Sequence, residues 1–162
     1  MKRQRSLPGK SAAAALFAIL TVVLVLGSCA TGRTVTPLHE AVRDGQSSRA
    51  EAEISGGADV NAQDEEGRTP LHYACGNGDV DMVRLLLAAG ADVTIAADDG
   101  NTPLHYAADN CYGEIAEMLV KSGADIASVN NDGKTPLDLA AAVECADLVA
   151  YFVQLSEEMA LE

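Results

Sequence analysis

Apolar residues along this chain fall into short helical stretches that come in pairs. Spacings of three and four predict a first helix that starts at Thr69-Pro70, runs to about Asn77 and ends at Gly78. Asp79 is placed to cap a second helix with a wider apolar face. The members of that face are Val80, Met82, Val83, Leu85, Leu86 and Leu87. The pattern therefore predicts an all-α helix-turn-helix unit.

The same pattern recurs at one fixed interval. The motif Thr-Pro-Leu-His, or Thr-Pro-Leu-Asp in its last copy, begins every 33 residues, at Thr36, Thr69, Thr102 and Thr135. Gly-Ala-Asp-Val or Gly-Ala-Asp-Ile follows three of these threonines, at 57–60, 90–93 and 123–126. From about Arg33 onward the chain therefore resembles ankyrin repeats, whose signature is this period and the motif T-P-L-H-x-A. The resemblance implies a solenoid of stacked helix pairs with β-hairpin or turn fingers between them.

Four repeats are expected, at about 34–66, 67–99, 100–132 and 133–162. Repeat one differs most, because Glu53 stands where repeat two has Leu86, and we expect it to be a polar and weakly stable cap. Repeat three has Cys111 in place of Gly78, so we expect its inter-helix turn to be remodelled. Repeat four has Asp138 in place of histidine and is expected to close the row.

Residues 1–28 have the pattern of an export signal. Basic residues precede an apolar run from Ala12 to Leu26, and Leu26-Gly27-Ser28-Cys29 resembles the lipobox of bacterial lipoproteins. The resemblance implies cleavage before Cys29 and acylation of its thiol. Incorporation of labelled palmitate would report that acylation. An uncleaved signal anchor is the alternative.

A lipid on Cys29 would leave residues 29–33 as a short tether and hold the domain at 34–162 close to a membrane. Ala30 is not the aspartate that keeps enteric lipoproteins at the inner membrane. By resemblance the outer membrane is favoured, with the domain in the periplasm or at the cell surface.

The charge of the chain bears on its partners. From Cys29 onward there are seven basic and 24 acidic residues, a formal charge of −17. Nucleic acid is not expected as a partner, because binding phosphates needs clustered Lys and Arg. A basic protein or dissolved cations suit this surface better, unless the charge only keeps a small monomeric domain soluble.

No residue set predicts catalysis, a metal or a cofactor. Equivalent residues in stacked repeats lie about 8–10 Å apart, whereas zinc ligands lie about 2 Å from the metal, so His39, His72 and His105 do not suit one ion. The resemblance implies hydrogen bonds within and between repeats for these histidines. Cys75 lies on the same helix as His72, in a buried small-residue position, and does not suit a nucleophile.

Cys111 and Cys145 fall in neighbouring inter-helix turns, one position out of register. Export would favour a disulfide, but a bridge requires Cα atoms within about 7 Å, and the sequence leaves both states open. Since three cysteines follow Cys29, at least one thiol stays free, and we expect it to be Cys75.

The resemblance also implies a non-catalytic protein-binding groove formed by fingertips and first helices. Its fingertip residues are Gln63, Glu65, Glu66, Arg68, Asp98, Asp99, Asn101, Asn131, Asp132 and Lys134. Its helix residues are Tyr73, Asn77, Tyr106, Asp109 and Asn110. The two tyrosines are candidate anchors, or else pack beneath the fingers, and the acidic tips also suit plain turns. A structural, stress-support or cation-buffering role in the envelope, without a groove partner, is the alternative.

Overall fold

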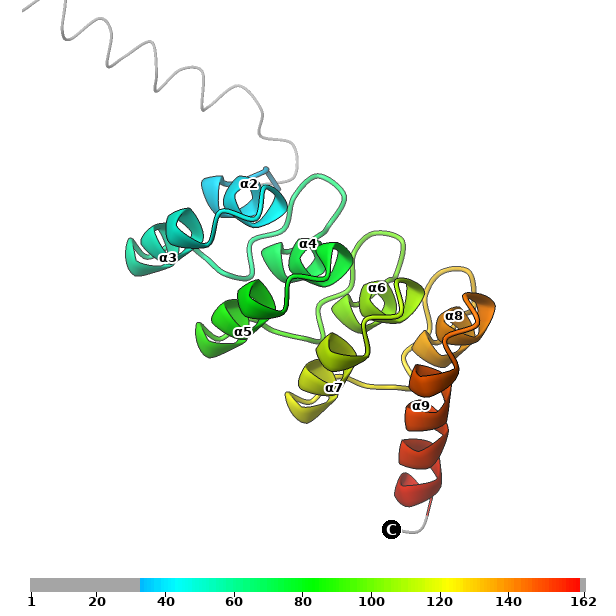
Figure 1. Ribbon diagram of the computed structural model, residues 1–162. Coiled ribbons are helices and arrows are strands. Elements are labelled where there is room, and N and C mark those ends of the chain that lie inside the picture. The colour runs from blue at the N-terminus through cyan, green and yellow to red at the C-terminus, as the bar shows by residue number, and fades with distance from the viewer. Residues whose placement is uncertain (1–32, 161–162) are drawn as a thin grey trace, which may run out of the picture. The chain divides into compact units, whose positions relative to one another are not determined.

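The computed structural model describes residues 33–160, and the expected signal segment and Cys29 lie outside the described residues. Eight helices and no strand occupy the described part, as the all-α prediction requires. They pair as α2 (Pro37–Arg43) with α3 (Ser47–Ser55), α4 (Pro70–Asn77) with α5 (Val80–Ala88), α6 (Pro103–Asp109) with α7 (Gly113–Lys121), and α8 (Pro136–Ala142) with α9 (Ala146–Met159). Figure 1 shows the first helices of these pairs stacked in chain order, with the second helices in a row beside them. None of the helices in this part is both long and apolar enough to cross a membrane.

The helix boundaries follow from local chemistry. Each first helix has an extended threonine before it and a proline in its first turn, where the missing N–H has no partner to lose. In repeat two Gly78 ends α4 with a φ of 73°, and the carboxylate of Asp79 accepts a hydrogen bond from Met82 N at 3.0 Å. The predicted first helix of repeat two, from Pro70 to Asn77, is confirmed.

The inter-helix turn at Cys111 is not remodelled, so that expectation was wrong. Cys111 has a φ of 57°, close to the φ of Gly78 in repeat two, and Glu144 has the same value at the equivalent position of repeat four. A non-glycine residue in this conformation costs roughly 1–2 kcal/mol. The packing of the helix pairs holds the turn in its left-handed form in spite of that cost.

The core lies between the two rows of helices and is built from small and aliphatic side chains. Leu38, Leu71 and Leu104, one from each of the first three repeats, are fully buried. The second helices of repeats two and three bury several residues each, whereas α3 buries only Ala50 and leaves Glu53 half-buried. Repeat one therefore has the polar outer helix that the sequence predicts for an end of the row.

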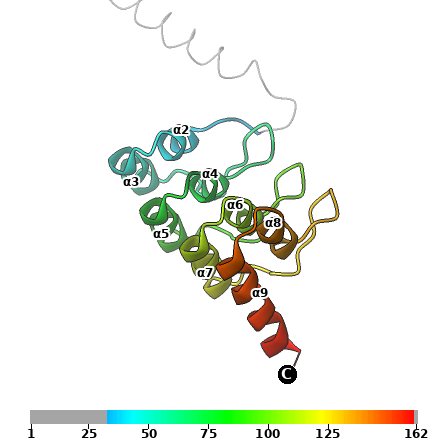
Figure 2. The same cartoon turned by 45° about the vertical axis from the view of Figure 1, so that its right-hand side comes forward.

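The segments between helix pairs project from the row as three fingers: the first finger (58–68), the second finger (91–101) and the third finger (124–134) (Figure 2). In each finger one backbone N–H donates to a carbonyl oxygen four residues later: Asp64 to Arg68, Ala97 to Asn101, and Asn130 to Lys134, at 2.9 to 3.0 Å. In the described residues the fingers are turns without strands. The projecting loops that the resemblance implies are present, but as turns, and no β-hairpin ladder forms.

Candidate partner-binding surface

Buried histidines fix the end of each finger to the first helix of the repeat that precedes it. His72 Nδ1 accepts a hydrogen bond from Thr69 N at 2.9 Å, so this nitrogen carries no proton. Nε2 must then carry it, and donates to the carbonyl oxygen of Asn101 at 3.2 Å. His39 and His105 make the same pair of contacts, with the carbonyl oxygens of Arg68 and Lys134. The structural role expected of the histidines is confirmed.

Burial changes the acidity of these rings. It lowers the pKa of His72 from 6.5 to about 4, and it also lowers the pKa of His39 and of His105. All three rings are therefore neutral near pH 7, as hydrogen-bond acceptance at Nδ1 requires.

Asp64 organises the first finger and was not among the predicted site residues. This side chain is 1% exposed, and its Oδ1 accepts from Glu66 N at 3.0 Å and Arg68 N at 2.9 Å. Its Oδ2 accepts from the Tyr73 hydroxyl at 2.6 Å. The equivalent residue is Ala97 in the second finger and Asn130, which also caps its turn, in the third. The available signal was the preference of aspartate and asparagine for turns. Both Asp64 and Asn130 stand three positions before a glycine and four before a basic residue.

The two tyrosines differ in how much surface they offer. Tyr73 lies beneath the first finger, with its hydroxyl on Asp64 and the Arg68 guanidinium 4.8 Å from its ring centroid. Burial, together with that hydrogen bond, raises the pKa of Tyr73 to about 12. Tyr106 packs edge-on against His72, and its hydroxyl reaches Asp99 only at 3.5 Å. Tyr73 is thus mainly a structural residue, and Tyr106 is the tyrosine available to a ligand.

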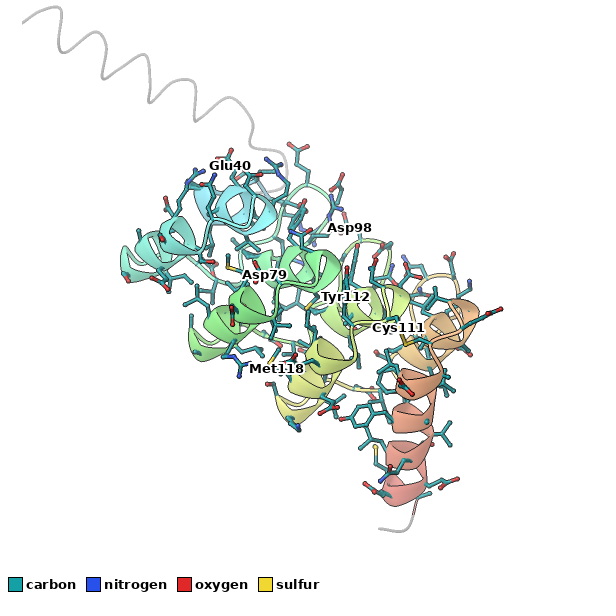
Figure 3. All side chains as sticks on the ribbon, in the orientation of Figure 1. Glu40, Asp79, Asp98, Cys111, Tyr112 and Met118 are labelled. Atoms are coloured by element: carbon teal, nitrogen blue, oxygen red, sulfur yellow. A yellow bond between two sulfur atoms is a disulfide. The ribbon has the colours of Figure 1, made fainter. Side chains whose placement is uncertain are left out.

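The fingers are joined to one another near their tips. Asp98 N donates to the carbonyl oxygen of Glu66, and Asn131 N donates to that of Asp99, at 2.9 and 3.0 Å. The Asn131 side chain adds a hydrogen bond to the carbonyl oxygen of Asp98 at 2.8 Å. Figure 3 shows Asp98 on the finger side of the row and Met118 on the side of the second helices. Exposed side chains of different repeats are therefore held in fixed relative positions.

Two hollows lie along this surface and share Tyr106. The first has a volume of about 300 Å³ and is lined by Glu65, Glu66, Arg68, Ala97, Asp98, Asp99 and Tyr106. The second has a volume of about 210 Å³ and is lined by Asn101, His105, Tyr106, Asp109, Asn130, Asp132, Lys134 and Leu139. The structure thus brings together most of the predicted fingertip residues, with one tyrosine between the two hollows.

Other predicted site residues line neither hollow and have structural partners. Asn77 donates to the carbonyl oxygen of Arg43, and Asn110 donates to that of Tyr106. Gln63 donates to the carbonyl oxygen of Gly67 at 2.8 Å. Together with Tyr73 and Asn131, these residues support the surface more than they form it.

The first hollow is strongly acidic. Four carboxylates, those of Glu65, Glu66, Asp98 and Asp99, face a single cation inside it. That cation, Arg68, is already engaged in ion pairs with Glu66 and with Asp64. Among the described residues no basic side chain pairs with Glu65 or Asp99. The hollow therefore has unneutralised negative charge beside an aromatic ring.

The cysteines fall into two states. Cys111 and Cys145 form a disulfide that joins repeats three and four, with Cα atoms 5.7 Å apart. The shift of one position in register thus still allows a bridge. Cys75 is free and buried, and burial raises the pKa of its thiol. A buried thiol of raised pKa does not suit a nucleophile, and no cluster of three metal-binding side chains occurs among residues 33–160.

A family model of ankyrin repeats, in three copies, matches residues 38–130. The chain belongs to the ankyrin-repeat family. Ankyrin repeats are a non-catalytic interaction fold, so this chain carries a protein–protein interaction module. A comparison with curated proteins found no match. The residues matched as ankyrin repeats include the first two fingers and most of the third, and hence all of the first hollow and part of the second.

Proposed function

We propose that this ankyrin-repeat chain binds a protein partner through its fingertips and first-helix face and carries out no catalysis. The observation that supports this most is the pair of hollows on either side of Tyr106, lined by side chains from neighbouring repeats. Such a partner would contact Glu65, Glu66, Asp98 and Asp99 at one end, and Asp109, Asp132 and Lys134 at the other.

A basic partner suits this surface, because exposed carboxylates outnumber cations there. The same charge disfavours nucleic acid, whose phosphates would be repelled. A monomeric ankyrin domain is the simplest arrangement that leaves the surface free for such a partner, and sedimentation of the purified chain tests it.

The experiment is affinity capture with the full chain in detergent, using extract of the bacterial envelope. We expect a captured protein to be released as salt is raised, because exposed charge pairs are screened over about 8–10 Å at physiological salt. Asp132→Lys, at the exposed tip of the third finger, should weaken capture. Glu117→Lys, an equal charge change on the exposed side of α7, is the matched control and should not.

The alternative is a structural, stress-support or cation-buffering role in the envelope. In that case Tyr106→Ala and Asp132→Lys would leave the cellular function unchanged in a folded protein. Loss of function with Asp132→Lys, but not with Glu117→Lys, would instead support a partner on the fingers.

We also propose that residues 1–28 are a lipoprotein signal and that Cys29 carries the lipid, with the outer membrane favoured. The support is the sequence Leu26-Gly27-Ser28-Cys29 after a basic and then apolar segment. Two or three acyl chains anchor a protein stably, whereas one is marginal. Radiolabelled palmitate should enter the wild-type protein and not Cys29→Ala, and equal labelling of both would exclude this anchor.

A further inference from the structure

The acidic surface of the fingers already holds a guanidinium from this chain. Arg33 lies ahead of α2, and its Nη1 donates to Asp98 Oδ1 at 2.5 Å. Its Nη2 donates to Gln63 Oε1 at 3.3 Å. The two ends of one guanidinium fork thus contact the first and the second finger. A lysine ammonium has no such planar fork.

The backbone that carries this carboxylate is held in place. The backbone of Asp98 donates to the first finger at Glu66 and accepts from the third finger at Asn131. Its side chain lies directly over Gly67, where an added Cβ would come within 2.6 Å of Asp98 Oδ1. The position of Asp98 between the fingers is therefore fixed, and Asp98 belongs to the first hollow.

The contact with Arg33 is open to exchange. The Arg33 and Asp98 side chains are 34% and 53% exposed, so water and a competing cation can reach both. An exposed pair of this kind contributes little free energy and is readily replaced. The neighbouring carboxylates of Glu65 and Asp99 lack a basic partner among the described residues, and Tyr106 offers an aromatic face beside them.

Resting on the function proposed above, we propose that the first hollow is an arginine-binding site for a basic partner and that Arg33 is its intramolecular competitor. In the free protein the guanidinium of Arg33 is paired with the Asp98 carboxylate, and an arginine of the partner must displace Arg33 to bind there. Arg33 is the last residue of the expected tether at 29–33, so displacement would also detach this residue, at the end of the tether, from the fingers.

The test measures binding of a fluorescent peptide of alternating arginine and glycine to the full chain in detergent. Arg33→Gln should tighten binding about two- to fivefold, the range expected for loss of one exposed competing pair. Asp98→Asn should weaken binding, and adding Arg33→Gln to Asp98→Asn should give no further gain. The matching lysine–glycine peptide should bind more weakly than the arginine peptide.

Arg84→Gln is the control for net charge, because Arg84 is an exposed cation on α5 whose ion pair is with Glu114 and not with the fingers. The proposal would be overturned if Arg84→Gln tightened peptide binding as much as Arg33→Gln does. It would also be overturned if Arg33→Gln still tightened peptide binding in a protein that carries Asp98→Asn. So would the absence of arginine-peptide binding in every variant. Thermal unfolding followed by circular dichroism verifies that each variant is folded.

The outcome is separable from that of the proposed function. If capture of an envelope protein is lost with Asp132→Lys but unaffected by Arg33→Gln and Asp98→Asn, the partner-binding function stands and the arginine site is excluded. If the peptide shows the expected Arg33 effect while no protein is captured, the site stands and a stable envelope partner is excluded.

Discussion

At the scale of single residues, each buried histidine serves two repeats at once. Nδ1 of His72 accepts from the first turn of its own helix, and Nε2 donates to the finger that leads into the next repeat. Within residues 33–160 no finger follows repeat four, and there Asp138 performs only the first task, accepting from Thr135 N at 2.8 Å. That backbone hydrogen bond lowers the pKa of the Asp138 carboxyl. The change from histidine to aspartate fits the end of the row.

Acid should weaken the fold through His72. Its pKa is lowered to about 4 in the folded chain and is near 6.5 when unfolded, so the unfolded chain binds more protons between these values. Stability therefore falls as the pH drops from 6.5 toward 4, by about 2 kcal/mol at pH 5. His72→Gln should be less stable at pH 7.5 but should lack this component. The measurement is the urea unfolding free energy of both proteins at pH 7.5 and 5. Parallel pH profiles would contradict the prediction, because carboxylate titration is common to both proteins.

Cys111 has an unfavourable left-handed backbone conformation and also forms the disulfide with Cys145. Two substitutions can separate the effects of these features on stability. Cys111→Ser and Cys111→Gly both remove the disulfide, which closes a loop of sequence separation 34 and should contribute about 3–4 kcal/mol. Only glycine also relieves the φ of 57°. We expect Cys111→Gly to be about 1 kcal/mol more stable than Cys111→Ser. Thermal unfolding of both variants, with reduced wild type as reference, measures this difference. Equal stabilities would mean that the turn relaxes once the bond is gone.

At the scale of elements, the fingers depend on close backbone approach. Gly67 and Gly133 occupy equivalent places in the first and third fingers, and both have a φ of 75°. A Cβ at Gly67 would lie 2.9 Å from Asp98 N, whereas a Cβ at Gly133 would meet nothing within 4 Å. The two glycines thus share one conformational requirement and differ only in their contact with a neighbouring finger.

Gly67→Ala should therefore destabilise the protein more than Gly133→Ala. Both variants bear the cost of a left-handed alanine, about 1 kcal/mol, and only Gly67→Ala also displaces the second finger. We expect an additional loss of about 1–2 kcal/mol and weaker partner binding, because Asp98 would move. Chemical denaturation of the two variants gives the difference directly. A difference near zero would show that the fingers are not coupled through this contact.

The elements differ in how far the sequence could predict them. The first helix of repeat two was predictable because the Thr-Pro start and the Gly78 stop are local signals, and the 33-residue period repeats them. The role of Asp64 was not, because it depends on Tyr73 approaching from another element. Arg33 and Asp98 lie 65 positions apart, and no sequence pattern relates them. Predicting the disulfide required the distance between the Cα atoms of Cys111 and Cys145, which the helix-turn pattern alone does not give.

At the scale of the whole domain, the two ends of the row are unequal. The C-terminal repeat is tied to repeat three by the disulfide, and α9 extends to Met159, so that it is longer than the other second helices. The N-terminal repeat has no such link, and the side chain before α3, Gln46, makes no capping hydrogen bond. Repeat proteins gain stability from each repeat and from each interface between neighbours. The domain should therefore open first from repeat one.

Glu53→Leu should correct that weakness. Glu53 is half-buried at the position where repeat two has the fully buried Leu86, so a leucine there should add apolar burial. We expect a gain in unfolding free energy of about 1–2 kcal/mol and slower amide exchange in α3, which in the wild type should exchange before α4 to α7.

Glu51→Leu makes the same change at an exposed position of α3 and should change neither quantity appreciably. Hydrogen exchange followed by mass spectrometry measures both variants. Equal protection of α3 and α5 in the wild type would exclude opening from this end, and an equal gain from Glu51→Leu would trace the effect to lost charge, not to burial.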